Sequence, residues 1–291
     1  MRLVRWRPYL LMAPVLACLA LFTYVPLLRS LYDSLFDTRM ADTMPFVGWA
    51  NYQRLFADPV FWQACWNNLL YIAMTVAPSL VLALGLAVWL KQNTRINQAM
   101  RAVIFMPMVL PLVSVATLFL FVYLPSMGLL DYYLSQLFGF MNHNFLGMKS
   151  SVLVALAALG IWKFTGYYML FFLAGLQAIP SDVQEAAKME GASRWQIFRY
   201  ITWPMLRPTI NFVVTVAVIY AITQIDHVAV MTEGGPAHAS TTLLFYIQRL
   251  ATQTHDYGKA SAATLVMLVV LVTLTIVNLK YLERGTHYEH Q

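Results

Sequence analysis

The stretch VLVALAALGIWKFTGYYMLFFLAGLQA, residues 152–178, decides the class of fold. It is almost wholly apolar, and Lys163 is its only charged residue. About 20 consecutive apolar residues in a helix cross the hydrocarbon core of a bilayer, whereas a strand in a soluble protein needs far fewer. The stretch therefore predicts a transmembrane helix.

Similar apolar runs occur on both sides of this one. Hydrophobic residues make up 60% of the chain and charged residues 11%, against about 25% charged in soluble domains. The sequence predicts an all-α membrane protein that forms a single transmembrane domain over residues 1–291. Its six expected spans are 9–32, 61–90, 101–124, 152–178, 206–231 and 260–282.

The first run has a second interpretation as a signal peptide. Arg2, Arg5 and Arg7 precede it, and Val15 to Cys18 faintly resembles a lipoprotein cleavage site. The apolar run continues to Leu28, which is too long for a signal sequence, so a retained span is the favoured interpretation. The two cysteines, Cys18 and Cys65, have no metal-binding spacing.

Lysine and arginine are distributed unevenly between the segments that join the spans. The N-terminus, the 91–101 and 179–208 loops and the C-terminal tail carry twice as many of them as the loops on the opposite side. Positive residues accumulate on the cytoplasmic side of a membrane. Both termini are therefore expected in the cytoplasm, with the protein in a bacterial inner membrane. The basic residues form no stripe, which argues against nucleic acid as a partner.

The 179–208 loop has strong helix signals. Ser181-Asp182-Val183-Gln184 and Ser193-Arg194-Trp195-Gln196 are both capping-box patterns, and Gly191 is placed to end the first helix. The second helix is expected to end before Pro204. Two short amphipathic helices follow from these signals. Physical chemistry alone leaves open whether they lie on lipid or dock on another protein.

The same loop carries a recognisable motif. Glu185-Ala186-Ala187, then Gly191, then Ile201 and Trp203-Pro204 resemble the EAA loop of permease subunits in binding-protein-dependent ABC importers. The resemblance implies a type I importer permease whose coupling helix enters a cleft on an ATPase subunit. Trp203 replaces the usual Leu and Glu190 the common Asp. The residues expected to couple to the ATPase are Glu185, Ala186, Ala187, Gly191, Ile201 and Pro204.

Further stretches resemble the subfamily that imports maltose, other sugars and glycerol-3-phosphate. They are Arg7 to Leu11 with Ala13-Pro14, Phe46 to Gly48 with Asn51-Tyr52, Trp162-Lys163, Leu173 to Pro180, Gly234 to Pro236, and Tyr257 to Ala262. The resemblance implies a second homologous permease, two copies of an ATP-binding subunit, and a periplasmic or lipid-anchored binding protein. That protein is expected to dock on the 33–60, 125–150 and 232–259 loops.

The chain contains no G-x-x-x-x-G-K-[ST] segment, so it has no P-loop for ATP. We expect no enzymatic activity and no cofactor in this chain, with ATP and Mg bound by the partner ATPase. An ion-coupled secondary transporter is the distant alternative, but such proteins use carboxylates within the membrane. No Asp or Glu lies at mid-depth in the expected spans, and His227 has no partner suited to an intramembrane enzyme.

Polar residues within the spans are candidates for the solute path. In 152–178 they include Trp162, Lys163 and Tyr167. Lys163 needs water, an anion or a carbonyl partner, so it either contacts solute or has a structural role. Tyr220, Gln224 and His227 are spaced to form one helical stripe.

The family resemblance implies that Tyr220 and Gln224 line a central sugar site, and helix packing is the competing explanation. The expected solute is a sugar or sugar-like compound. Glycerol-3-phosphate or an acidic sugar derivative is the alternative.

Overall fold

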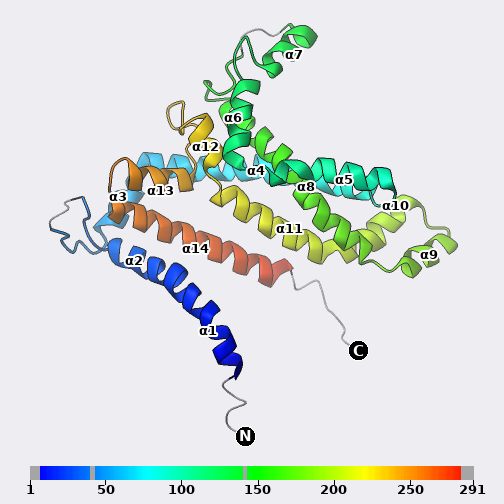
Figure 1. The fold of residues 1–291 in the computed structure, drawn as a ribbon, viewed down its shortest axis with the longest axis horizontal. Coiled ribbons are helices and arrows are strands. Elements are labelled where there is room, and N and C mark those ends of the chain that lie inside the picture. Colours follow the sequence, from blue (N-terminus) through cyan, green and yellow to red (C-terminus); the bar gives the residue numbers. More distant parts are fainter. Residues whose placement is uncertain (1–6, 40–42, 140–142, 283–291) are drawn as a thin grey trace. The chain divides into compact units, whose positions relative to one another are not determined.

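The computed structural model describes residues 7–39, 43–139 and 143–282, and Figure 1 shows the fold. Arg2, Arg5 and Arg284, which entered the charge comparison, lie outside these residues. Apart from one isolated bridge between Phe36 and Phe46, the regular structure of the described residues is helical. Five of the described helices are long and apolar enough to cross a membrane, or six if one bent pair counts as a span.

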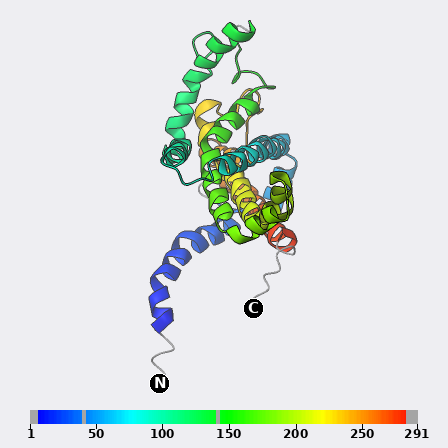
Figure 2. The ribbon, with the colours of Figure 1, turned by 90° about the vertical axis from the view of Figure 1, so that its right-hand side faces the viewer.

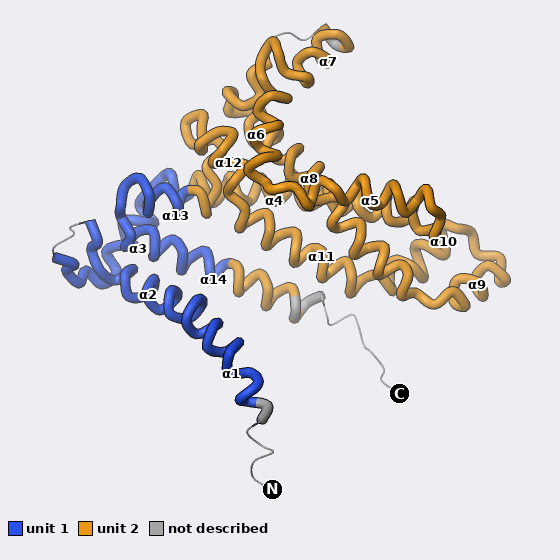
Figure 3. Tube along the Cα trace, viewed as in Figure 1, with its two compact units in different colours: residues 1–62, 246–270 blue, residues 63–245, 271–291 orange. Residues whose placement is uncertain are grey.

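The chain divides into two compact units, coloured separately in Figure 3. The first contains residues up to 62 together with 246–270, and the second contains 63–245 and the residues from 271 onward. The helices of the first unit are α1 (Arg7–Leu19), the π-helical η2 (Ala20–Tyr24), α2 (Val25–Asp33), α3 (Ala50–Phe56), and most of α13 (Leu243–Thr252). Helix α14 (Tyr257–Leu282) begins in the first unit and ends in the second.

The second unit contains α8, the most buried of the helices that are long and apolar enough to cross a membrane. Its elements are α4 (Pro59–Trp89, which starts in the first unit), α5 (Arg95–Val109), α6 (Leu112–Val122), α7 (Leu129–Phe138), α8 (Val152–Gln177), α9 (Ser181–Met189), α10 (Arg194–Ile197), the π-helical η3 (Phe198–Thr202), α11 (Trp203–Thr223) and α12 (Asp226–Met231). Helix α8 packs against α5 on one side and α11 on another. In its most apolar window 72% of the residues are buried, which makes α8 the centre of this unit.

The expectation of one continuous helix over 101–124 is wrong. Helices α5 and α6 meet at an angle of 97° across a short break, and Figure 2 shows the turn between them. Leu110 is extended, with ψ 138°, and Pro111 follows it. The ring of a proline disfavours the helical conformation of the preceding residue. Pro111 therefore accounts for the break.

The expected helix over 206–231 is also interrupted. Helix α11 ends at Thr223, Gln224 is extended with ψ 128°, and α12 starts at Asp226. Tyr220, Gln224 and His227 therefore do not form one helical stripe. An acidic residue in the first turn of a helix is favourable, so Asp226 was a sequence signal for this new start.

The second helix of the 179–208 loop does not stop before Pro204. It continues from α10 through the π-helical turn η3 into α11 without a loop. Pro204 occupies the first turn of α11, where the missing N–H of proline is tolerated. The described residues of the 125–150 loop, 125–139 and 143–150, contain one short helix, α7. The Gly234–Pro236 stretch forms a turn closed by Gly235 N–H donating to the Thr232 carbonyl at 2.8 Å.

Candidate functional site

Helix α9 ends in a left-handed turn at Gly191. Its φ is +83°, a conformation that favours glycine because a Cβ would crowd the backbone. The Gly191 N–H donates to the Lys188 carbonyl at 3.0 Å, and Ala192 N–H donates to Ala187 at 2.9 Å. These bonds satisfy carbonyls that the end of α9 leaves open. The predicted role of Gly191 as the end of this helix is confirmed.

Only the second of the two predicted capping boxes forms. The Ser193 hydroxyl accepts from Gln196 N–H at 3.3 Å, and the Gln196 side chain accepts from Ser193 N–H at 2.8 Å. At the first, Pro180 is the N-cap and makes no side-chain bond. Ser181 lies one position inside the helix, and its hydroxyl contacts Asp182 at 3.2 Å instead. Because proline fixes its own backbone, α9 starts one residue after it.

The segment from α9 to η3 forms an open cleft of about 360 Å³. It is lined by Ala187, Glu190, Gly191, Ala192, Gln196, Ile197, Tyr200 and Ile201. Three predicted coupling residues, Ala187, Gly191 and Ile201, therefore meet. Glu185 and Ala186 are exposed on α9 outside the cleft, and Pro204 lies further along, in α11. The cleft residues thus share one surface.

Lys163 lies buried in α8, with 4% of its surface exposed. Its Nζ donates to the carbonyls of Leu110 at 2.6 Å and Pro107 at 3.1 Å, and lies 3.5 Å from that of Met108. These carbonyls flank the break between α5 and α6, where no helical N–H reaches them. Lys163 therefore supplies the donors that the break removes, which is the structural alternative for this residue.

A second pocket lies between α4, α8 and α11. It is lined by Tyr71, Thr75, Val76, Ser79, Gly160, Phe164, Tyr168, Ala217, Tyr220, Ala221 and Gln224. None of these lining residues is a Lys, Arg, Asp or Glu. Two predicted path residues, Tyr220 and Gln224, belong to the lining. Hydroxyls, one amide and aromatic rings give the pocket a polar but uncharged wall.

The other predicted path residues do not line this pocket. Tyr167 packs edge-on against Tyr220, with ring centroids 6.0 Å apart. Trp162 is 45% exposed and tilts against Phe119 at 5.4 Å. The Lys163 ammonium group donates to backbone carbonyls at the α5–α6 break. The structure therefore divides the predicted set into two lining residues, one residue behind the lining, and two that lie elsewhere.

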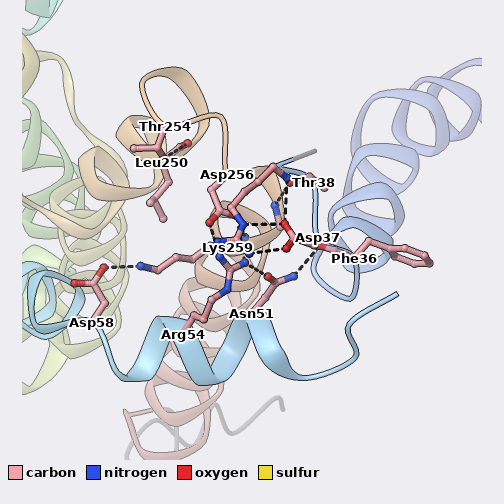
Figure 4. Close-up of polar contacts among 12 residues, drawn as sticks. Phe36, Asp37, Thr38, Asn51, Arg54, Asp58, Leu250, Thr254, Asp256 and Lys259 are labelled. Atoms are coloured by element: carbon pink, nitrogen blue, oxygen red, sulfur yellow. Dashed lines mark hydrogen bonds and ion pairs between the residues drawn. The ribbon is translucent and has the colours of Figure 1, made fainter. Parts of the chain in front are cut away.

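A cluster of charged residues in the first unit was not predicted. We call Arg54, Asp58, Asp256 and Lys259 the polar clasp (Figure 4). Arg54 pairs with Asp256 at 2.9 Å, and Lys259 pairs with Asp58 at 2.6 Å. Only 14% of the Lys259 side chain and 18% of the Asp58 side chain are exposed. The clasp therefore joins the 33–60 segment to the start of α14 through partly buried ion pairs.

Neighbouring residues complete the clasp. Asn51, fully buried, donates to the carbonyls of Ser34 at 2.7 Å and Phe36 at 2.8 Å. The Gly258 N–H donates to Thr38 at 2.7 Å, and a Cβ on Gly258 would lie 2.5 Å from the Phe36 carbonyl oxygen. Two stretches quoted for the family resemblance, one around Asn51 and one around Gly258, thus meet. The charged residues in these two stretches were the sequence signal from which the clasp could have been predicted.

Asp58 is the acceptor at the centre of three donors. Besides Lys259 it accepts from the Tyr246 hydroxyl at 2.7 Å and from Val60 N–H at 2.8 Å. Burial raises the pKa of Asp58, but the bonds from Lys259, Tyr246 and Val60 together outweigh burial, so the pKa lies below its ordinary value. The carboxylate is therefore held in its charged form.

Membrane-length helices, an exposed glycine-capped helix pair and an uncharged internal pocket define a membrane transport subunit. Among the described residues, no group of three or more His, Cys, Asp and Glu could hold a metal ion. The family model for the inner membrane component of binding-protein-dependent transport systems matches residues 79–288. The chain belongs to this family. It is a multi-pass inner-membrane protein and a non-catalytic permease subunit of an ABC importer.

Named relatives align along nearly the whole chain. The trehalose/maltose transport system permease protein MalF of Thermococcus litoralis is 33% identical, with 94% of this chain and 92% of that protein covered. The sn-glycerol-3-phosphate transport system permease protein UgpA of Yersinia enterocolitica is 30% identical, with 98% and 96% covered.

A solved structure shares the fold. A chain of a bacterial ABC transporter that imports the acidic polysaccharide alginate superposes with a TM-score of 0.84, at 23% identity, over 98% of this chain and 99% of that one. The all-helical permease architecture predicted from the sequence is therefore confirmed.

Proposed function

We propose that this chain is the transmembrane permease subunit through which a sugar or sugar-like solute enters the cell, driven by ATP hydrolysis in a partner subunit. The observation that carries the proposal is the α9–η3 segment of a chain of the importer family, where three residues of the EAA-type motif, Ala187, Gly191 and Ile201, line an open cleft. Residues 1–291 act as one permease domain. Both termini lie in the cytoplasm, on the same side as α9.

The working complex contains more than this chain. It combines a second, homologous permease, two copies of a cytoplasmic ATP-binding subunit, and a periplasmic or lipid-anchored binding protein that delivers the solute. The family's description as binding-protein-dependent supports the last of these. So does the structure of the alginate importer in complex with a periplasmic protein bound to an alginate pentasaccharide. ATP and Mg stay on the ATP-binding subunit.

The coupling residues transmit closure of the ATPase to the spans. Ala187, Gly191 and Ile201 form the cleft surface, and Glu185 and Ala186 offer exposed side chains on α9. Pro204 stands where the segment becomes α11. Helices α10, η3 and α11 are continuous. A displacement of this segment by the ATPase is therefore transmitted along one helix to Tyr220, which lines the pocket.

The chemistry of the pocket lining matches a neutral sugar better than an anion. Aromatic rings stack on the apolar faces of sugars, and the hydroxyls and the Gln224 amide match sugar hydroxyls. Lys163, the charge nearest the middle of a span, is occupied by three carbonyls. Glycerol-3-phosphate or an acidic sugar derivative is the second candidate, since the UgpA relative is about as similar as the MalF relative.

The coupling role is tested with Gly191→Pro and Glu185→Lys. Proline cannot adopt φ +83° and removes the N–H that bonds Lys188. We expect both variants to insert normally but to lose ATP-driven uptake and stimulation of the ATPase by the loaded binding protein. Gly139→Pro, at the left-handed end of α7, is the matched control for folding and should insert as the two coupling variants do. Normal uptake by both coupling variants would contradict the proposal.

The complex is tested by purifying the tagged chain from its native membrane and identifying the proteins that come with it. A P-loop ATPase and a second permease are expected. The co-expressed binding protein is then screened against neutral sugars, acidic sugars and glycerol-3-phosphate by thermal shift. Preference for an anion would replace the neutral sugar by the second candidate.

A further inference from the structure

Tyr71 on α4 was not singled out by the sequence, yet it forms part of the pocket wall. It is 4% exposed, and its hydroxyl makes no hydrogen bond with any described residue. Two buried tyrosines outside this pocket have partners: Tyr123 donates to the Ala155 carbonyl at 2.9 Å, and Tyr246 donates to Asp58 at 2.7 Å. Buried polar groups in folded proteins almost always have a partner, because an unpaired hydroxyl is costly to desolvate. Tyr71 thus has a donor and an acceptor left over, in a pocket.

We propose that the Tyr71 hydroxyl binds a hydroxyl group of the transported sugar, and that Gly160 and His227 hold the phenol in place for this contact. The inference rests on the proposed function, and it adds α4 to the solute-binding wall. A sugar hydroxyl both donates and accepts, as the phenol does. The pocket then recognises solute from three helices: Tyr71 on α4, Tyr168 on α8 and Tyr220 on α11.

Gly160 on α8 makes room for the phenol. A Cβ at this position would lie 2.8 Å from Tyr71 Oη and 3.2 Å from Thr75 Cγ2. The first distance is too short for a real contact, so a side chain at 160 would push the hydroxyl out of its position. Gly160 has an ordinary helical backbone within α8, where glycine is unfavourable. The close approach of Tyr71 explains why a glycine stands there.

His227 packs against the ring of the phenol. Its ring stacks on that of Tyr71, with centroids 5.1 Å apart and planes 28° from parallel. His227 is 1% exposed, and neither ring nitrogen has a hydrogen-bond partner among the residues that the structure describes. Its contact with Tyr71 is therefore through the ring face. The break after α11 places His227 in α12 and Gln224 in the pocket lining. His227 is a positioning residue, because it acts through Tyr71.

The experiment uses the whole importer in proteoliposomes, with its binding protein outside and ATP inside. The probe is the radiolabelled mono- or disaccharide that the wild type takes up fastest from a panel. Tyr71→Phe removes one hydrogen bond to solute, and we expect uptake to fall about threefold to tenfold. Tyr123→Phe is the matched control: it removes a structural bond, and uptake per inserted protein should stay unchanged.

Two double variants separate positioning from folding. Gly160→Ala should lower uptake at least as much as Tyr71→Phe, and should add little in the Tyr71→Phe background, because the crowded oxygen is gone. His227→Ala should lower uptake, His227→Phe should restore it by keeping the stacked ring, and His227→Ala should add little to Tyr71→Phe. Such non-additivity marks residues that act as a unit.

Wild-type uptake by Tyr71→Phe, or effects that multiply in the double variants, would overturn this inference and leave the proposed function standing. Uptake of no panel sugar by the wild-type importer would instead overturn the proposed solute class.

Discussion

The α9–η3 segment and the polar clasp are built in opposite ways. The clasp satisfies its charges within the chain: Asp58 accepts from three donors, and Arg54 pairs with Asp256. Around α9, side chains such as Glu185 are exposed. Among the described residues, the one side-chain bond between α9 and a distant segment runs from Lys91, in the loop between α4 and α5, to Gln184 at 3.2 Å. A region whose polar groups are paired within the chain contributes to stability. A region whose side chains are exposed and unpaired is suited to bind another protein.

The Lys163 contact belongs with the clasp in this comparison, because a buried charge there is satisfied by the chain's own carbonyls. Damage to such regions should lower stability and leave the transport step intact. Damage to the α9–η3 segment should do the reverse. The predictions below test this separation.

The largest expected loss of stability is for Lys163→Met. The substitution leaves carbonyls at the α5–α6 break without a donor, at a cost of about 3 kcal/mol. Thermal unfolding of the purified protein in detergent measures it. Lys149→Met, at an exposed lysine, is the matched control and should unfold like the wild type. A Lys163→Met protein of normal stability with altered solute selectivity would instead make Lys163 a solute contact.

A smaller, pH-dependent loss is expected at the clasp. The pKa of Asp58 is lowered in the folded state, so the unfolded chain binds this proton more readily. The stability that Asp58 contributes is therefore present above the ordinary carboxyl pKa and is lost as the pH falls below about 5 towards the folded value.

Asp58→Asn tests this directly. It should remove about 1–2 kcal/mol at neutral pH and flatten the acid dependence of unfolding. The exposed Asp182→Asn should change neither. An unchanged acid profile in Asp58→Asn would show that the clasp does not stabilise the charged carboxylate.

The smallest structural change gives the sharpest comparison. Gly191 and Gly139 both have left-handed backbones, with φ +83° and +67°, and a Cβ at either would meet nothing within 4 Å. Replacement by Ala should cost each about 1 kcal/mol of strain. The loss of thermal stability of Gly139→Ala measures this strain by itself, whereas uptake by Gly191→Ala should also fall several-fold. Normal uptake by Gly191→Ala would mean that the shape of the α9 turn is not used in coupling.

The sequence was a good guide wherever one local signal dominated. Long apolar runs gave the helices α4, α8 and α14 because a bilayer demands about 20 apolar residues. Glycine at 191 and the Ser193–Gln196 box gave the two ends of the α9–α10 turn, since each acts within a few residues. The family motif, read at fixed spacing, indicated the importer class that the comparisons then established.

Errors arose where two signals competed within one apolar run. Over 101–124 hydropathy masked the effect of Pro111, and over 206–231 it masked the helix start at Asp226. At Pro180 the capping-box pattern of Ser181 was overridden, because the proline itself became the N-cap. In each case a local backbone preference prevailed over the longer pattern.

The sequence by itself determined that this protein is a helical membrane permease with an exposed EAA-type segment, because hydropathy and capping depend on neighbours along the chain. Only the tertiary structure decided which polar residues share a site. It separated Lys163 from Tyr220, brought Tyr71 and His227 together, and closed the clasp between residues about 200 positions apart. Such pairings depend on which helix faces meet, and that is fixed by packing between distant segments rather than by any local pattern.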